Sequence, residues 1–163
     1  MSTISDFAEA IHRNLQDKSR DDVIFDTIRK NNLKNRIAIS QYYQATYESS
    51  LFEDIKKNIN GDFGYCAAQM FLSPLEFCLH HLKLGLKKNN ECVFEILTSK
   101  TPEELKIIEK EYIKDTGNDL KSDISKTFNG SVGRNLLNLF STHRIKNPKP
   151  KKSECENYAN ILR

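Results

Sequence analysis

The chain repeats itself: one residue pattern occurs twice, 69 positions apart, within 163 residues. Matched positions carry identical or closely related residues, among them Ile24 with Val93, Tyr43 with Tyr112, Asp54 with Asp123, Gly61 with Gly130, Gly64 with Gly133 and Phe71 with Phe140. A constant offset over about fifty positions indicates a duplicated structural unit. Each copy is long enough to hold several helices around a small core.

Composition and charge argue against several classes of protein, among them nucleic-acid-binding and membrane-spanning proteins. The chain is 38% hydrophobic and carries 25 basic and 22 acidic residues, so its net charge is only +3 and nucleic acid is not an expected partner. No apolar run reaches the roughly 18 residues that a membrane span needs, and the N-terminus lacks the pattern of a signal peptide. The four cysteines have no paired spacing, which predicts free thiols and a cytoplasmic location. Three of them lie in apolar patterns and are expected to pack there: Cys66, Cys78 and Cys92.

The apolar spacing predicts an all-α fold with five helices in each copy. Ile4, Ile11 and Leu15 recur on one face of a first helix. Further helices of the first copy are expected over about 21–29, 33–47, 50–58 and 62–72. The last of these carries the apolar residues Phe63, Cys66, Ala67, Met70 and Phe71.

The second copy has clearer helix boundaries. Pro74 opens its first helix, and the segment Thr101-Pro102-Glu103-Glu104 has the residues of a capped helix start. Gly130, like Gly61, is expected to separate the fourth helix from the fifth. Glycine at matched positions indicates a backbone conformation or a close approach that a side chain would hinder.

The second copy resembles the annexin family. Residues 93–112, VFEILTSKTPEELKIIEKEY, are similar to the family's most recognisable stretch, and Gly117, Asp123 and Gly130 follow in family order. The first copy is a more diverged version. The resemblance divides the chain into annexin-like repeat 1 at 4–72, annexin-like repeat 2 at 73–141, a basic Pro/Lys linker at 142–152 and the start of a truncated third repeat at 153–163. Divergence of this degree is similar to that of protist annexins, including the giardins.

This resemblance implies repeats in a right-handed superhelical arrangement, followed here by a short helical stub. It also implies calcium-dependent binding to anionic phospholipid. In the family, a Gly-x-Gly-Thr loop between the first two helices supplies carbonyl ligands to calcium. An acidic residue near the end of the fourth helix completes the shell, as a hard cation with six to eight oxygen ligands requires.

The chain departs from the family at these calcium positions. Asp17-Lys18-Ser19-Arg20 stands in the first loop and Lys87-Lys88-Asn89-Asn90 in the second, while Asn58 and Thr127 hold the places of the acids. Added cations repel a divalent ion. We expect no tight calcium binding at these degenerate positions (Asp17, Ser19, Asn58, Lys88, Thr127) and no required cofactor, although calcium follows from the resemblance. The acids Glu53, Asp54 and Asp123 lie earlier on the fourth helices and are expected to cap or pair.

Two functions follow from this pattern. In the first, basic side chains of the two loops contact anionic phospholipid in place of calcium; these are Lys18, Arg20, Lys87 and Lys88. The alternative for the same four residues is an ordinary solvated loop surface. In the second, the chain is a calcium-independent cytoskeletal or protein-interaction scaffold. With either function, we expect the protein to be non-catalytic and to lie at the periphery of a membrane or of the cytoskeleton. We also expect it to form a homodimer or to bind a protein partner through an exposed apolar face.

The adjacent pair His80-His81 invites a metal interpretation, but neighbouring residues on a helix point in different directions and no further ligand stands at zinc spacing. Packed or surface histidines are expected instead.

Overall fold

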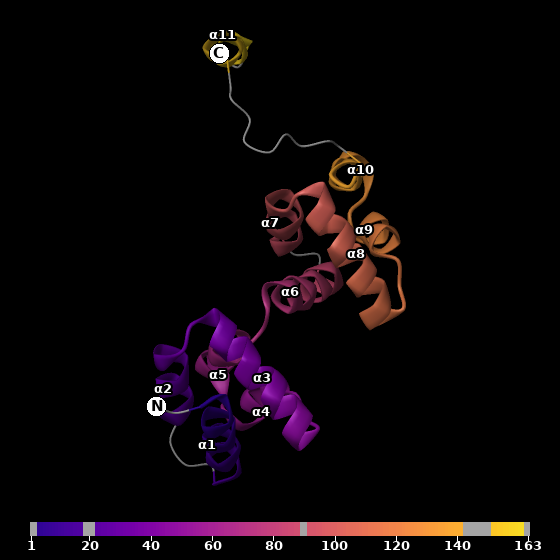
Figure 1. Ribbon diagram of the computed structural model, residues 1–163. Helices are drawn as coiled ribbons and strands as arrows, with labels where there is room; N and C mark the ends of the chain where they lie inside the picture. Colours follow the sequence, from indigo (N-terminus) through magenta and orange to yellow (C-terminus); the bar gives the residue numbers. More distant parts are fainter. Residues whose placement is uncertain (1–2, 18–21, 89–90, 142–150, 162–163) are drawn as a thin grey trace. The chain divides into compact units, whose positions relative to one another are not determined.

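The computed structural model describes residues 3–17, 22–88, 91–141 and 151–161, and over these ranges the chain is helical and has no strand (Figure 1). The first copy contains α1 (Ile4–Asp17), α2 (Asp22–Lys30), α3 (Leu33–Tyr47), α4 (Leu51–Asn58) and α5 (Gly61–Gln69). The second contains α6 (Pro74–Lys88), α7 (Cys92–Ser99), α8 (Pro102–Thr116), α9 (Leu120–Thr127) and α10 (Gly130–Asn138), and α11 (Lys152–Ile161) follows. The predicted all-α class is confirmed.

The chain forms two compact units, residues 1–84 and 85–163. The boundary between them falls inside α6, so most of this helix belongs to the first unit. The repeat boundaries expected from the sequence, and the identity of residues 153–163 as the start of a third repeat, stay predictions. Within the described ranges no helix is both long enough and apolar enough to cross a bilayer.

Each unit has its own apolar core. In the first, Ile11, Ile24, Ile39, Ile55 and Phe71 are fully buried and belong to one cluster of packed side chains. In the second, the fully buried side chains include Val93, Leu97, Leu105, Leu120 and Ile124. The buried residues of α2, α4, α7 and α9 include the matched pairs on which the repeat was recognised, so the duplication preserves the two interiors.

Helix starts follow the capping residues in the sequence. Thr101 Oγ1 accepts a hydrogen bond from the Glu104 backbone N–H (3.2 Å), while the Glu104 carboxylate accepts one from the Thr101 N–H (2.8 Å). This reciprocal arrangement satisfies two N–H groups that the first turn of a helix otherwise leaves unpaired. The capped start of α8 is therefore confirmed.

The matched glycines have two different physical roles. Gly61 and Gly130 adopt φ of +76° and +68° where the fifth helices begin, a conformation that other residues adopt only with strain. Gly64 and Gly133 lie so close to the preceding turn that an added Cβ would collide with the carbonyl oxygen of Ile59 or Phe128. Both expectations, a special conformation and a close approach, are confirmed.

One prediction about α5 is wrong. The helix ends at Gln69 rather than at 72, and its apolar residues divide between two faces. Ala67 is buried, whereas Phe63, Cys66 and Met70 are exposed. Phe63 and Cys66 on α5, and Met70 directly after it, are thus not part of the core, so Cys66 is not a packed core thiol.

Candidate functional site

In the first unit, a polar hollow of about 260 Å³ lies where the last turns of α1 and α4 approach the middle of α3. Its lining consists of His12, Leu15, Gln16, Tyr43, Asp54 and Asn58. Asn58, which stands where the family has an acid, is thus brought beside the end of α1. Its amide Nδ2 donates to the Asp54 carbonyl oxygen at 2.8 Å, one turn earlier in α4.

A chain of hydrogen bonds crosses the hollow. The Tyr43 hydroxyl donates to Asp54 Oδ2 (2.8 Å) and lies 3.2 Å from His12 Nδ1, while Gln16 Nε2 lies 2.8 Å from His12 Nε2. Since the hydroxyl proton goes to the carboxylate, His12 Nδ1–H donates to the phenol oxygen and Nε2 accepts from the amide. The ring also stacks on Tyr47 with centroids 3.7 Å apart. Burial and the bond to Asp54 raise the pKa of Tyr43 well above its ordinary value.

The second unit repeats the tyrosine–aspartate bond but not its surroundings. The Tyr112 hydroxyl donates to Asp123 Oδ2 (3.0 Å), and burial and this carboxylate raise the Tyr112 pKa to about 12. Asp123 also pairs with Lys126, whose Nζ lies 3.3 Å from Oδ1. The prediction that Glu53, Asp54 and Asp123 cap or pair is confirmed, since each aspartate accepts from a tyrosine and Glu53 contacts Lys56 at 3.3 Å.

In the second unit, the residues expected from the resemblance to replace a calcium position are a threonine and two lysines. Thr127, the last residue of α9, donates its hydroxyl to the Leu86 carbonyl oxygen at 3.3 Å. Lys87 and Lys88 follow as the exposed last residues of α6. The fold therefore brings the end of the fourth helix of this copy next to the end of its first.

Other predicted site residues have mixed outcomes. Asp17 is the exposed last residue of α1. Lys18, Ser19 and Arg20 lie outside the described residues. In the ranges that the structure describes, no three His, Cys, Asp or Glu side chains gather as a group that could hold a metal.

The histidine pair on α6 packs against the first unit, as expected. His80 Nε2 lies 2.8 Å from the Tyr65 hydroxyl, and His81 Nε2 lies 2.7 Å from Gln69 Oε1. The Phe52 ring meets His80 edge-on with centroids 4.9 Å apart. Burial lowers the pKa of both histidines, and the charge repulsion of His81, Lys56 and Lys83 lowers that of His80 further.

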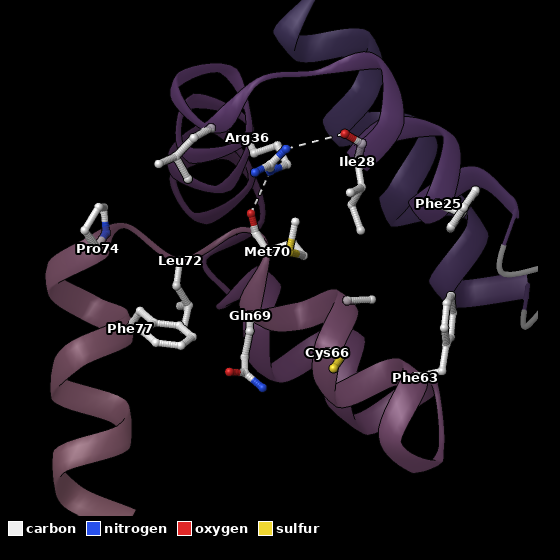
Figure 2. Close-up of a pocket in the computed structure, with 12 residues that line it drawn as sticks. Phe25, Ile28, Arg36, Phe63, Cys66, Gln69, Met70, Leu72, Pro74 and Phe77 are labelled. Carbon is white, nitrogen blue, oxygen red and sulfur yellow. Dashed lines mark hydrogen bonds between the residues drawn. The ribbon is translucent and has the colours of Figure 1, made fainter. Parts of the chain in front are cut away.

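An apolar hollow of about 550 Å³ on the first unit was not expected in this form; we call it the apolar groove. It lies among α2, the start of α3, α5 and the first turn of α6, and its lining residues are Phe25, Ile28, Leu33, Arg36, Phe63, Cys66, Ala67, Gln69, Met70, Leu72, Pro74 and Phe77. Figure 2 shows Phe25 and Phe63 at one end and Pro74 and Phe77 at the other. Five large apolar side chains here are 41–56% exposed: Phe25, Leu33, Phe63, Met70 and Phe77.

Arg36 links the segments that form the wall of the groove by hydrogen bonds. Its Nε donates to the Met70 carbonyl oxygen (2.8 Å) and its Nη1 to that of Ile28 (3.5 Å) (Figure 2). Nη1 also donates to the Asn31 carbonyl oxygen (2.8 Å). The guanidinium thereby satisfies carbonyl groups at the ends of α2 and α5, where helix dipoles favour a cation.

Comparison with known proteins agrees with this architecture. The annexin family model matches residues 78–139. Mouse (Mus musculus) annexin A3 is 27% identical over 160 residues, which is 95% of this chain and 49% of annexin A3. Human (Homo sapiens) annexin A4 is 27% identical over 127 residues, 76% of this chain and 40% of the relative. The chain thus spans about half the length of the curated relatives it matches, or less.

Solved structures give the same result. Annexin III matches with a TM-score of 0.81 at 26% identity, covering 99% of this chain and 51% of annexin III. Calcium-bound alpha-14 giardin matches with a TM-score of 0.72 at 14% identity, over 98% of this chain and 53% of the giardin, a likeness of fold alone. Together with the duplicated five-helix pattern, these matches support a diverged annexin-family protein.

Proposed function

We propose that this chain is a non-catalytic peripheral module that binds anionic phospholipid surfaces through basic side chains rather than through tightly held calcium. Membership of the annexin family supports the membrane partner. Binding through basic side chains rather than calcium is supported by the end of α6. There Thr127 donates to the Leu86 carbonyl oxygen, and the exposed Lys87 and Lys88 follow.

Calcium chemistry fits these residues poorly. The ion takes six to eight oxygens, and carboxylates supply much of the negative charge of a tight site. Asn58 offers one neutral amide oxygen and Thr127 one neutral hydroxyl, while the adjoining ammonium groups repel a divalent cation. The likeness of fold to calcium-bound alpha-14 giardin therefore does not extend to tight calcium coordination by this chain.

Electrostatic contact would be weak and sensitive to salt. Each basic residue close to an anionic bilayer contributes about 1 kcal/mol. Four residues are proposed to make this contact, Lys18, Arg20, Lys87 and Lys88. Together they contribute a binding free energy on the order of a few kcal/mol at best. Screening acts over about 8 Å at physiological ionic strength, which makes such binding fall steeply as salt rises. Peripheral location in the cytoplasm, at membrane or cytoskeleton, is part of the same proposal.

Co-sedimentation with vesicles of phosphatidylserine and phosphatidylcholine tests this function. The assay compares chelator with millimolar calcium, each at low and at high salt. We expect pelleting at low salt in chelator and loss of pelleting at high salt. Pelleting that chelator abolishes would show ordinary calcium-dependent binding and overturn the electrostatic account.

A charge-reversed variant locates the contact. The double substitution Lys87→Glu, Lys88→Glu should reduce pelleting at low salt by about tenfold or more, since it removes two attractions and adds two repulsions. The matched control is Lys106→Glu, Lys110→Glu, which makes the same charge change on exposed positions of α8. Equal loss in both variants would mean that net charge alone, not the end of α6, governs binding.

The apolar groove favours a second candidate, a protein-interaction scaffold that associates with a partner or with itself. Exposed apolar surface concentrated in one hollow marks interaction sites more often than scattered exposed residues do. Absence of pelleting in every vesicle condition, together with association of the chain in solution, would favour this candidate.

A further inference from the structure

The apolar groove has the form of a receptor for a helix. It is an elongated hollow between helices, lined almost entirely by hydrocarbon and sulfur, and the described part of the chain leaves its large side chains 41–56% exposed. An amphipathic helix binds such grooves with apolar side chains spaced three and four residues apart. Any occupant must therefore present a helical apolar stripe.

The chain contains a helix that matches this requirement and has no packing of its own. In α11 every described residue is exposed, including Tyr158 at 66% and Ile161 at 70%. Cys155, Tyr158 and Ala159 recur at i, i+3 and i+4, and Ile161 lies three residues after Tyr158, so these side chains share one side of the helix. Asn160 lies on the opposite side.

Both surfaces are exposed to water as they stand. An isolated helix of ten residues is marginal in water, because its hydrogen bonds do not repay the cost of starting the helix. An exposed tyrosine and isoleucine gain by leaving water, and so do the phenylalanines of the groove. Placing the apolar side of α11 in the groove removes both sets of side chains from water.

We propose that α11 of a second copy of this chain occupies the apolar groove. Tyr158 and Ile161 enter the hollow lined by Phe63 and Phe77, and Cys155 comes near Cys66. If each copy gives its α11 to the other, the exchange closes as a symmetric dimer, a common outcome when an element is shared between protomers. This inference deepens the self-association candidate described above and does not depend on lipid binding.

Two native thiols provide a direct test. Cys66 lines the groove and Cys155 lies on the apolar stripe of α11, and both are exposed and free. Chains of normal and of heavy isotopic composition are mixed, treated with a short bis-maleimide and digested. The proposal predicts a Cys66 peptide of one label joined to a Cys155 peptide of the other. The substitution Cys155→Ser must abolish that product.

Substitutions test the energetics by sedimentation velocity over a range of concentrations. Tyr158→Asp and Phe63→Asp should each weaken dimerisation about ten- to a hundredfold, the loss that corresponds to exposing one large apolar side chain. Both positions are exposed, so the fold should persist, as circular dichroism can check.

Matched controls separate the contact from general effects of charge. Asn160→Asp adds the same charge to the opposite side of α11, and Val132→Asp alters the 43%-exposed counterpart of Phe63 in the second unit. Both should dimerise like the unchanged chain. A monomer at all concentrations, a Cys66–Cys155 product within one label only, or equal weakening by the controls would overturn the proposal. Vesicle pelleting is scored separately, so failure of one proposal leaves the other standing.

Discussion

The two five-helix copies keep the same interior bond but surround it differently. Tyr43 donates to Asp54 and Tyr112 to Asp123, at matched positions and at nearly equal lengths of 2.8 and 3.0 Å. Around the first pair stand the His12 and Tyr47 rings, whereas in the second Lys126 pairs with the carboxylate. The bond that ties the third helix to the fourth is thus retained, whereas the groups that surround it differ between the copies.

A second difference is visible at Arg36 and its counterpart Leu105. Arg36 binds carbonyl oxygens at the wall of the apolar groove, while Leu105 is fully buried in the core of the second unit. The same helical position therefore lines a surface groove in the first copy and is buried in the apolar core of the second. Backbone geometry constrains both copies alike, but side chains at the surface are free to specialise.

The largest effect should come from the close-packed glycines. Gly64→Ala and Gly133→Ala each force a Cβ into a backbone carbonyl, which no side-chain rotation relieves, so we expect each to cost about 3 kcal/mol of unfolding free energy or more. Urea denaturation measures it. The control Gly61→Ala has open space around its Cβ and only an unfavourable φ, so a loss of about 1–2 kcal/mol is expected. Equal losses at Gly64 and Gly61 would refute the collision.

Removing the tyrosine hydroxyls should distinguish the two copies. Tyr43→Phe and Tyr112→Phe each delete a hydrogen bond to a carboxylate, worth about 1–2 kcal/mol at these part-buried positions. The loss should be larger for Tyr43, because Asp123 retains Lys126 as a partner. Chemical denaturation of both variants, followed by the double variant Tyr112→Phe, Lys126→Ala, checks this order. A larger loss for Tyr112→Phe alone would contradict it.

Acid should weaken the first unit through α6. The pKa values of His80 and His81 are lowered in the folded chain, so the unfolded chain binds protons more readily and stability falls as pH drops below about 6.5. Above that value the stabilisation is fully present. Thermal unfolding between pH 7.5 and about 5 measures the slope. In the variant His80→Phe, His81→Gln the slope should be shallower, and an unchanged slope would exclude these histidines as its cause.

A smaller effect is expected in alkali. The Tyr112 pKa is raised to about 12 in the folded chain, and that of Tyr43 is raised as well, whereas an unfolded tyrosine titrates near 10. Stability linked to these groups is present below about pH 10 and is lost as pH rises above it. Spectrophotometric titration of phenolate should show late-ionising tyrosines, Tyr43 and Tyr112 among them, and Tyr112→Phe should remove one of these. Ionisation of all tyrosines near pH 10 in the folded chain would contradict the burial.

Much of the fold was predictable because it rests on local chemistry. The helix positions of α3 and α8, the Thr101 cap and the matched glycines follow from spacing and from capping residues. The Tyr43–Asp54 bond also left a signal, since tyrosine and aspartate recur together at the same offset in both copies. Sequence reasoning noted the matches but did not infer the contact.

The apolar groove was harder to foresee. Phe63, Ala67 and Met70 fall at i, i+4 and i+7, which is the spacing of one face of a helix. Periodicity alone does not tell which side meets the core, because that depends on how α2, α3 and α6 pack around it. Met70 was expected only as one of the apolar residues of this helix, and the structure leaves it 42% exposed.

Calcium titration of the purified chain without lipid tests the central claim, that basic side chains have replaced ion coordination. Equilibrium dialysis should show no saturable uptake below about 10⁻³ M, and Thr127→Glu, which restores an acid at the end of α9, should increase uptake. Stoichiometric binding by the unchanged chain at about 10⁻⁵ M or below would contradict the account.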